Sequence, residues 1–134
     1  MILLDTHVLL WLDTDAPQLG PAARQLIQES WQADAVAVSA ISFWEVAMLQ
    51  RRDRIALAVS PEQWRQDWLN AGLRELPLSG GVALAAVALE GFHADPADRF
   101  ITATALAHQA PLISADQSIL SWPEAALQRR DARR

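Results

Sequence analysis

Two aspartates stand directly after short apolar runs, where an acidic side chain can take part in chemistry. Asp5 follows the run Ile2–Leu4 and Asp116 lies two residues beyond the run Leu112–Ser114. Such runs are typical of buried strands, and ligands of open α/β sheets bind beyond the carboxyl ends of the strands. Aspartate at these places also caps helices or shapes turns. Because two strands end in the same way, we favour a shared site.

Glu45 falls within a predicted helix that begins near Ile41 and runs to about Arg52. Ile41, Met48 and Leu49 lie three or four residues from Glu45, so they share its expected face of the helix. We assign Trp44 to the same apolar stripe. A buried glutamate is unfavourable unless it is paired or binds a metal. The alternative is a capping box formed by Ser42 and Glu45. That alternative exposes the carboxylate and fits the apolar neighbours poorly, so we favour a functional role.

Asp98 falls in the first turn of a helix that we expect from Asp95 and the following proline to about Gln109. The helix dipole favours an aspartate there, so a purely structural role is an open alternative. Asp98 nevertheless shares a face with Ile101 and Ala105, which small apolar residues mark as the inward side. We expect Asp95 to point elsewhere and to cap the helix.

The four acids together predict a metal site. If Asp5, Glu45, Asp98 and Asp116 converge, each pair at ~4 Å repels by roughly 4 kcal/mol at an effective dielectric constant near 20. A marginally stable fold cannot hold several such pairs without compensation. Oxygen ligands select Mg2+ or Mn2+, and such ions assist the hydrolysis of phosphodiesters.

The elements that must position these acids alternate along the chain. We expect strands at 2–4, 35–38 and 112–114, with a further candidate at 73–76, and helices at 8–12, 21–31, 41–52, 61–71, 82–89 and 95–109, with a short one after Asp116. Short apolar strands between helices predict a parallel sheet covered on both faces. The expected fold class is α/β, a single three-layer α/β/α domain over residues 1–134 with four to five parallel strands. We expect the arginine-rich stretch from Gln128 to be frayed.

Composition removes several kinds of chemistry. The chain has no cysteine and its eleven cations are all arginine, which excludes thiolate nucleophiles, lysine Schiff bases and a Walker-type phosphate loop. The histidines His7, His93 and His108 lack metal-ligand spacing, and we expect each to be structural or exposed. The net charge of −5 lowers the expectation of tight nucleic-acid binding without excluding a nuclease. No apolar run suits a membrane span and no secretory signal is visible, so we expect a cytoplasmic protein.

Four blocks of the sequence, in order, resemble the PIN-domain ribonucleases of the VapC toxin type. The blocks are Met1–Trp11, Ser39–Ala47, His93–Phe100 with Ala103 and Ala105, and Leu112–Asp116. Each block alone is weak evidence for the family, but each contains one of the four acids in the expected place. Together the blocks extend the resemblance from the first residue to about Trp122. Two mild departures are Ser114, where threonine is common, and Ala97, where a large apolar residue is common.

The resemblance implies more than the residues themselves. It implies Asp5 and Asp98 as principal Mg2+ or Mn2+ ligands, Glu45 and Asp116 as the rest of the acidic pocket, and Thr6 and Ser114 as supporting hydroxyls. It also implies RNA as substrate, a homodimer, and a cognate VapB-like antitoxin that blocks the pocket. Arg99 matches a frequent arginine to which we assign no role.

Two rival interpretations remain. A phosphatase of the haloacid dehalogenase type needs an aspartate at position 7 and a lysine, and this chain has neither. A catalytically silent PIN-like module that binds protein or RNA is the live alternative, separated from the nuclease by metal-dependent cleavage. Six tryptophans are many for this length, and Trp31, Trp64, Trp68 and the segment 82–89 are candidates for either the core or an interface.

Overall fold

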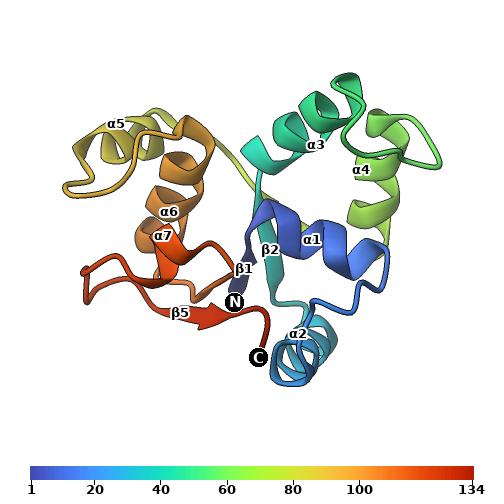
Figure 1. Cartoon of the computed structure of the whole chain (residues 1–134), viewed down its shortest axis with the longest axis horizontal. Coiled ribbons are helices and arrows are strands. Elements are labelled where there is room, and N and C mark those ends of the chain that lie inside the picture. The colour runs from blue at the N-terminus through green and yellow to red at the C-terminus, as the bar shows by residue number, and fades with distance from the viewer.

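A parallel five-stranded sheet forms the centre of the molecule in the computed structural model, which describes residues 1–134 (Figure 1). The strands are β1 (Ile2–Leu4), β2 (Val36–Ser39), β3 (Arg74–Leu76), β4 (Leu112–Ser114) and β5 (Arg129–Asp131). Their order across the sheet is β3-β2-β1-β4-β5, and every neighbouring pair is parallel. The candidate strand at 73–76 is therefore present as β3, and the predicted α/β class is confirmed.

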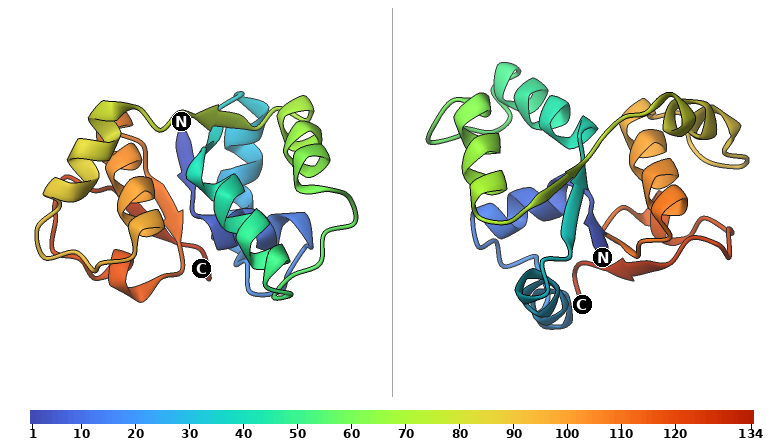
Figure 2. Two further views of the ribbon diagram at one scale, coloured as in Figure 1. Left: turned by 90° about the horizontal axis from the view of Figure 1, so that it is seen from above. Right: turned by 180° about the vertical axis from the view of Figure 1, so that it is seen from behind.

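Seven helices cover the sheet in two groups (Figure 2). They are α1 (Thr6–Asp13), α2 (Pro21–Gln32), α3 (Ile41–Arg51), α4 (Pro61–Asn70), α5 (Gly80–Ala88), α6 (Pro96–His108) and α7 (Gln117–Leu120). The helices α1 to α4 lie on one side, and α6 and α7 lie on the other, with α5 packed against α6. No helix is long and apolar enough to cross a membrane.

The sheet has an apolar cluster on each face, because successive side chains of a strand point to opposite faces of the sheet. Leu4 of β1 belongs to the apolar cluster beneath α1 to α4, together with Val38 and Ile113 of the neighbouring strands. Leu3 and Leu112 belong to the second cluster, beneath α6 and α7. The continuous apolar runs of the sequence are therefore buried on both faces, as expected for parallel strands.

The carboxy-terminal segment is ordered, so the expectation of a frayed end from Gln128 is wrong. Residues 129–131 form β5, whose edge position lets polar side chains face solvent. Beyond it, the Ala132 amide donates to Ser114 (2.8 Å), the Ala132 carbonyl accepts from Gly20 (2.8 Å), and the Arg134 carbonyl accepts from Ala22 (2.8 Å). A Cβ atom at Gly20 would lie 2.3 Å from the Arg133 carbonyl oxygen, so this close approach of two backbones needs glycine.

Candidate metal centre

Asp5 lies at the carboxyl end of the central strand β1 and is 2% exposed. Its Oδ1 accepts a hydrogen bond from the Thr6 amide (2.8 Å), which makes it the N-cap of α1, and its Oδ2 accepts from Ser114 Oγ (2.7 Å). The Nδ1 atom of His7 lies 3.6 Å from the same Oδ2. The capping role and a place in the site are thus not alternatives, because the cap fixes the direction in which the carboxylate points.

Glu45 is held by a hydroxyl, and the capping-box interpretation of Ser42 is wrong. The N-cap of α3 is Ala40, which has no capping side chain, and the Ile41 amide donates to Ser39 Oγ (3.2 Å) and not to Ser42 or Glu45. Thr6 Oγ1 instead donates to Glu45 Oε1 and lies 2.9 Å from the fully buried Ser42 Oγ. Since the Thr6 hydroxyl has one proton, Ser42 is the donor in the second contact. Thr6 therefore joins the first acidic block to the second.

The apolar face that we predicted for α3 is also wrong in part. Trp44 is 56% exposed, whereas Ser42 and Val46, four residues apart, form the buried face. Glu45 lies at the border of that face. Burial raises the pKa of its carboxyl group; the hydrogen bond from Thr6 opposes this rise, and the charges of Asp5 and Asp95 add to it.

Asp98 lies in the first turn of α6 and faces the aspartates that follow β1 and β4. Burial raises its pKa to about 8, and the charges of Asp5, Asp95 and Asp116 push in the same direction, as does a hydrogen bond with Asp116. An acid shifted this far lacks a compensating cation nearby. The arrangement is therefore one in which carboxylates repel one another at close range.

The hydroxyl of Ser114 connects two of these acids. It donates to Asp5 Oδ2 and accepts a hydrogen bond from the Asp116 amide (3.0 Å). Asp116 in turn caps α7, because its Oδ1 accepts from the Ser118 amide (2.8 Å). The structural role that we had weighed for Asp116 is present, and its backbone is held in register with Asp5.

His93 belongs to the same group, although its spacing in the sequence gave no sign of it. Its Nε2 lies 3.1 Å from Asp98 Oδ2. One potential ligand atom from each of His93, Asp98 and Asp116 lies within 4.8 Å of the other two. The Nε2 atom is inaccessible to solvent and lacks a conventional hydrogen-bond partner. A bound cation, or a donor hydrogen on this nitrogen directed at Asp98, would satisfy this atom.

Asp95 is a further acid that sequence reasoning set apart. It caps α6 as expected, with its Oδ1 accepting from the Ala97 amide (3.0 Å). Its charge nevertheless raises the pKa of both Glu45 and Asp98, and it borders a pocket beside Glu45 and Arg52. The expectation that Asp95 is only a cap is therefore incomplete. Its position three residues before Asp98, the acid of α6, was the available signal.

Arg99 fixes the segment that carries His93. Its guanidinium donates to four backbone carbonyls, those of Ala86 (2.9 Å), Leu89 (3.2 Å), Phe92 (2.8 Å) and His93 (2.9 Å). It also lies 5.9 Å from the centre of the Phe92 ring. Arg99 thus holds the end of α5 and residues 89–93 against the first turn of α6, and it directs no charge of its own into the acidic group.

The donor set fits a divalent cation. Carboxylate oxygens come from five acids, Asp5, Glu45, Asp95, Asp98 and Asp116. No lysine or arginine charge lowers the raised pKa of Asp98. Hard cations prefer such oxygen ligands, and a single imidazole is compatible with them. All six side chains that the sequence singled out, including Thr6 and Ser114, belong to this one connected group.

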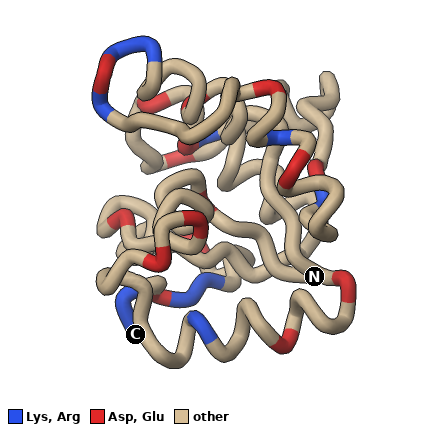
Figure 3. Tube along the Cα trace, turned by 90° about the vertical axis from the view of Figure 1, so that its right-hand side faces the viewer, with Lys and Arg blue, Asp and Glu red and all other residues tan.

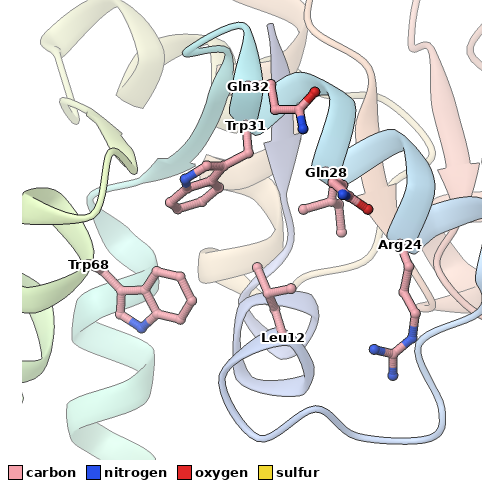
Figure 4. Close-up of a pocket in the computed structure, with 7 residues that line it drawn as sticks. Leu12, Arg24, Gln28, Trp31, Gln32 and Trp68 are labelled. Carbon is pink, nitrogen blue, oxygen red and sulfur yellow. The ribbon is translucent and has the colours of Figure 1, made fainter.

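A larger pocket lies elsewhere and contains none of these acids. It has a volume of about 640 Å³ between α1, α2 and α4, and its lining includes Leu12, Arg24, Trp31 and Trp68. Trp31 of α2 and Trp68 of α4 stand at one end and Arg24 at the other (Figure 4). The Arg24 guanidinium is already engaged by Asp15 and by two backbone carbonyls. The size of this pocket therefore does not mark the chemistry.

Comparison with known proteins agrees with the fold and shows the family. The chain is 40% identical over 121 residues to Ribonuclease VapC22 of Mycobacterium tuberculosis, which covers 90% of each chain. A toxin–antitoxin complex from Klebsiella pneumoniae has a similar fold, with a TM-score of 0.62 and 23% identity over 96% of this chain and 99% of that one. VapBC2 from Rickettsia felis, solved with a promoter DNA fragment, gives a TM-score of 0.67 and 18% identity over 97% and 98% of the two chains. The sequence profile of the PIN domain matches residues 2–122, and the chain belongs to the PIN-domain family.

Proposed function

We propose that this protein is an endoribonuclease that depends on Mg2+ or Mn2+ and acts as the toxin of a toxin–antitoxin pair. The observation that carries the proposal is geometric: ligand atoms of Asp98, Asp116 and His93 lie within 4.8 Å of one another, and Ser114 ties this group to the buried Asp5. The raised pKa of Asp98, caused by burial and by three neighbouring carboxylates, is consistent with that crowding. These carboxylates can all be ionised at the same time only when a cation binds among them and offsets their repulsion. The name of the 40% identical ribonuclease supports RNA as the substrate.

The proposed roles of the residues are those that the resemblance to the family implies. Asp5 and Asp98 are proposed as principal metal ligands, with Glu45 and Asp116 completing the acidic pocket. Thr6 and Ser114 are supporting residues, because their hydroxyls hold Glu45 and Asp5 in place. Partners of this kind fix the direction of a ligand atom and raise metal affinity.

The chain's own groups would prepare the reaction. A bound divalent cation supplies positive charge that makes water a better nucleophile and stabilises a leaving oxygen. Asp5 keeps one orientation because an amide and a hydroxyl each donate to it. Glu45, with its raised pKa, is suited to accept or return a proton beside the scissile bond.

The partners form part of the proposal. Similarity of fold to a toxin–antitoxin complex and to VapBC2 supports a cognate antitoxin that restrains the enzyme. We also propose a homodimer, for which the exposed Leu84 and Val87 of α5 offer apolar surface. RNA and such a partner would meet the protein in the cytoplasm.

The direct test is cleavage of a structured RNA pool by the purified chain. The reactions contain Mg2+, Mn2+ or EDTA, and the variants Asp5→Asn and Asp98→Asn serve as controls, because each removes a charge with little change in shape. We expect cleavage that needs metal and is lost in both variants. Cleavage that survives in either variant would point to a contaminating nuclease. If the folded, antitoxin-free chain cuts no RNA, the silent binding module becomes the better interpretation.

A further inference from the structure

A second pocket begins at the acidic group and ends at the carboxy-terminal segment. It has a volume of about 290 Å³ and is lined by His7, Trp11, Ala115, Asp116 and Arg133. Its connection to the acids is direct, because Asp116 forms part of its wall and His7 lies beside Asp5. The volume is near the lower end of the range for ligand pockets, roughly 300–1,000 Å³, which suits one small planar group.

The walls of this pocket are fixed by contacts to the backbone N–H and the backbone carbonyl of one residue, Ala115. The Ala115 amide donates to His7 Nε2 (2.9 Å), and the Ala115 carbonyl accepts from Arg133 Nη1 (2.7 Å). The ring of Trp11 packs edge-on against His7, with 5.1 Å between the ring centres, and the Arg133 guanidinium lies 5.5 Å from the centre of the Trp11 ring. The pocket is therefore built before any ligand arrives.

Arg133 places a cation beside an acidic site in a chain of net charge −5. Figure 3 shows basic positions gathered beside the carboxy terminus, close to acidic ones. Arg133 uses a single guanidinium hydrogen bond, so most of its five N–H donors are free. Arg52 borders the acids on another side, but its pocket also contains Glu45 and Asp95, which weaken its attraction for an anion.

We propose that this pocket binds the nucleotide next to the scissile phosphate of a single-stranded RNA. Arg133 holds the phosphate of that nucleotide, and the base packs against Trp11 and the guanidinium plane. Tryptophan and arginine are the side chains on which unpaired bases stack, and arginine also binds phosphate through two parallel hydrogen bonds. The inference rests on the proposed function, because it names where the substrate of that same site lies.

The test separates binding from cleavage. Binding of a fluorescent single-stranded RNA of about ten nucleotides is measured in the Asp98→Asn background, and cleavage of the same RNA is measured in the wild-type background. Arg133→Gln is compared with Arg134→Gln, which removes the same charge from the adjacent, exposed position. We expect Arg133→Gln to weaken binding about tenfold, to raise KM more than it lowers kcat, and to reduce the salt dependence of binding by about one phosphate contact. Arg134→Gln should change binding less than twofold.

Three further variants distinguish recognition from stability. Arg133→Lys keeps the charge but loses the planar group, so it should restore the salt dependence and only part of the affinity. Trp11→Leu should weaken binding several-fold, while Trp11→Phe keeps an aromatic ring and stays close to wild type. Thermal melting of each variant checks that it is folded.

The outcomes decide between the two proposals. Equal binding by the Arg133 and Arg134 variants, in a protein that cuts RNA, overturns the pocket and leaves the nuclease intact. If Arg133→Gln weakens binding, Arg134→Gln does not, and the protein without these changes cuts no RNA, the pocket is supported and the nuclease is overturned.

Discussion

The hydroxyl of Ser114 donates a hydrogen bond to Asp5 Oδ2 across 109 residues of sequence, with 2.7 Å between the two oxygens. This contact ties the ends of the two central strands and orients a buried carboxylate. Ser114→Ala leaves one oxygen of Asp5 without its donor, and we expect a loss of stability of roughly 1–3 kcal/mol. We also expect Mn2+ affinity to fall about tenfold or more, because the ligand loses its orienting partner.

Calorimetric titration with Mn2+ and urea denaturation would measure both effects. Ser114→Thr is the matched control, since it keeps the hydroxyl and should stay near wild type. Unchanged Mn2+ affinity in Ser114→Ala would show that Asp5 does not need the contact with Ser114, and that the Thr6 amide orients it sufficiently.

The raised pKa of Asp98 makes the metal-free fold sensitive to pH. Because the native state holds the proton of this carboxyl up to about pH 8, while an unfolded chain releases it near the ordinary value of 3.8, the native state binds more protons in between. Stability therefore falls as pH rises from about 4 to 8. Urea denaturation in EDTA at pH 5 and pH 8 should show this decline, and Asp98→Asn should flatten it. A decline that persists unchanged in Asp98→Asn would assign it to another group.

Metal binding should release the proton that Asp98 holds. At pH 6.5 this carboxyl is protonated in the metal-free protein, and a ligand must be ionised, so we expect about one proton to leave as Mn2+ binds. Titration in two buffers of different ionisation enthalpy measures that number. Asp116→Asn removes one of the charges that raise the pKa of Asp98, so it should release a smaller fraction of a proton at the same pH. Equal release from both proteins would contradict this coupling.

Arg99 is expected to act on the site through the segment 89–93. Arg99→Met removes a guanidinium that serves four carbonyls, and we expect a loss of roughly 1–3 kcal/mol together with faster amide exchange in this segment. Arg99→Lys supplies fewer donors in a different geometry and should recover only part of the loss. Exchange measured by mass spectrometry would check this, with the segment around β2 as an internal reference. Uniform acceleration across the chain would indicate global rather than local loosening.

The strands and their acids could be predicted because both follow from local sequence. A run such as Ile2–Leu4 is apolar throughout because it is buried on both faces of the sheet, so it can be predicted as a strand without knowing which strands lie beside it. The position of Asp5 then follows from the end of that strand. The strand β5 could not be found this way, because an edge strand made of Arg129, Arg130 and Asp131 has no apolar pattern and depends on backbone pairing with β4.

The surroundings of the acids were harder to predict than the acids themselves. Trp44 seemed to mark the inward face of α3, yet the buried face consists of Ser42 and Val46. A small side chain there lets Thr6 approach the helix, and that approach is a tertiary contact with no local signature. His93 was missed for the same reason, because its contact with Asp98 depends on how Arg99 folds the preceding segment.

The central position of β1 has a consequence for the synthesis of this protein. β1 leaves the ribosome before its partner β4 and the acid Asp116, which come more than a hundred residues later. Until β4 pairs with β1, Asp5 lacks its contact with Ser114, and Asp98 lacks a neighbour. Domains complete their folding only after such distant segments have been translated. A nascent chain therefore carries no complete acidic centre until β4 has paired with β1 and Asp116 has been translated.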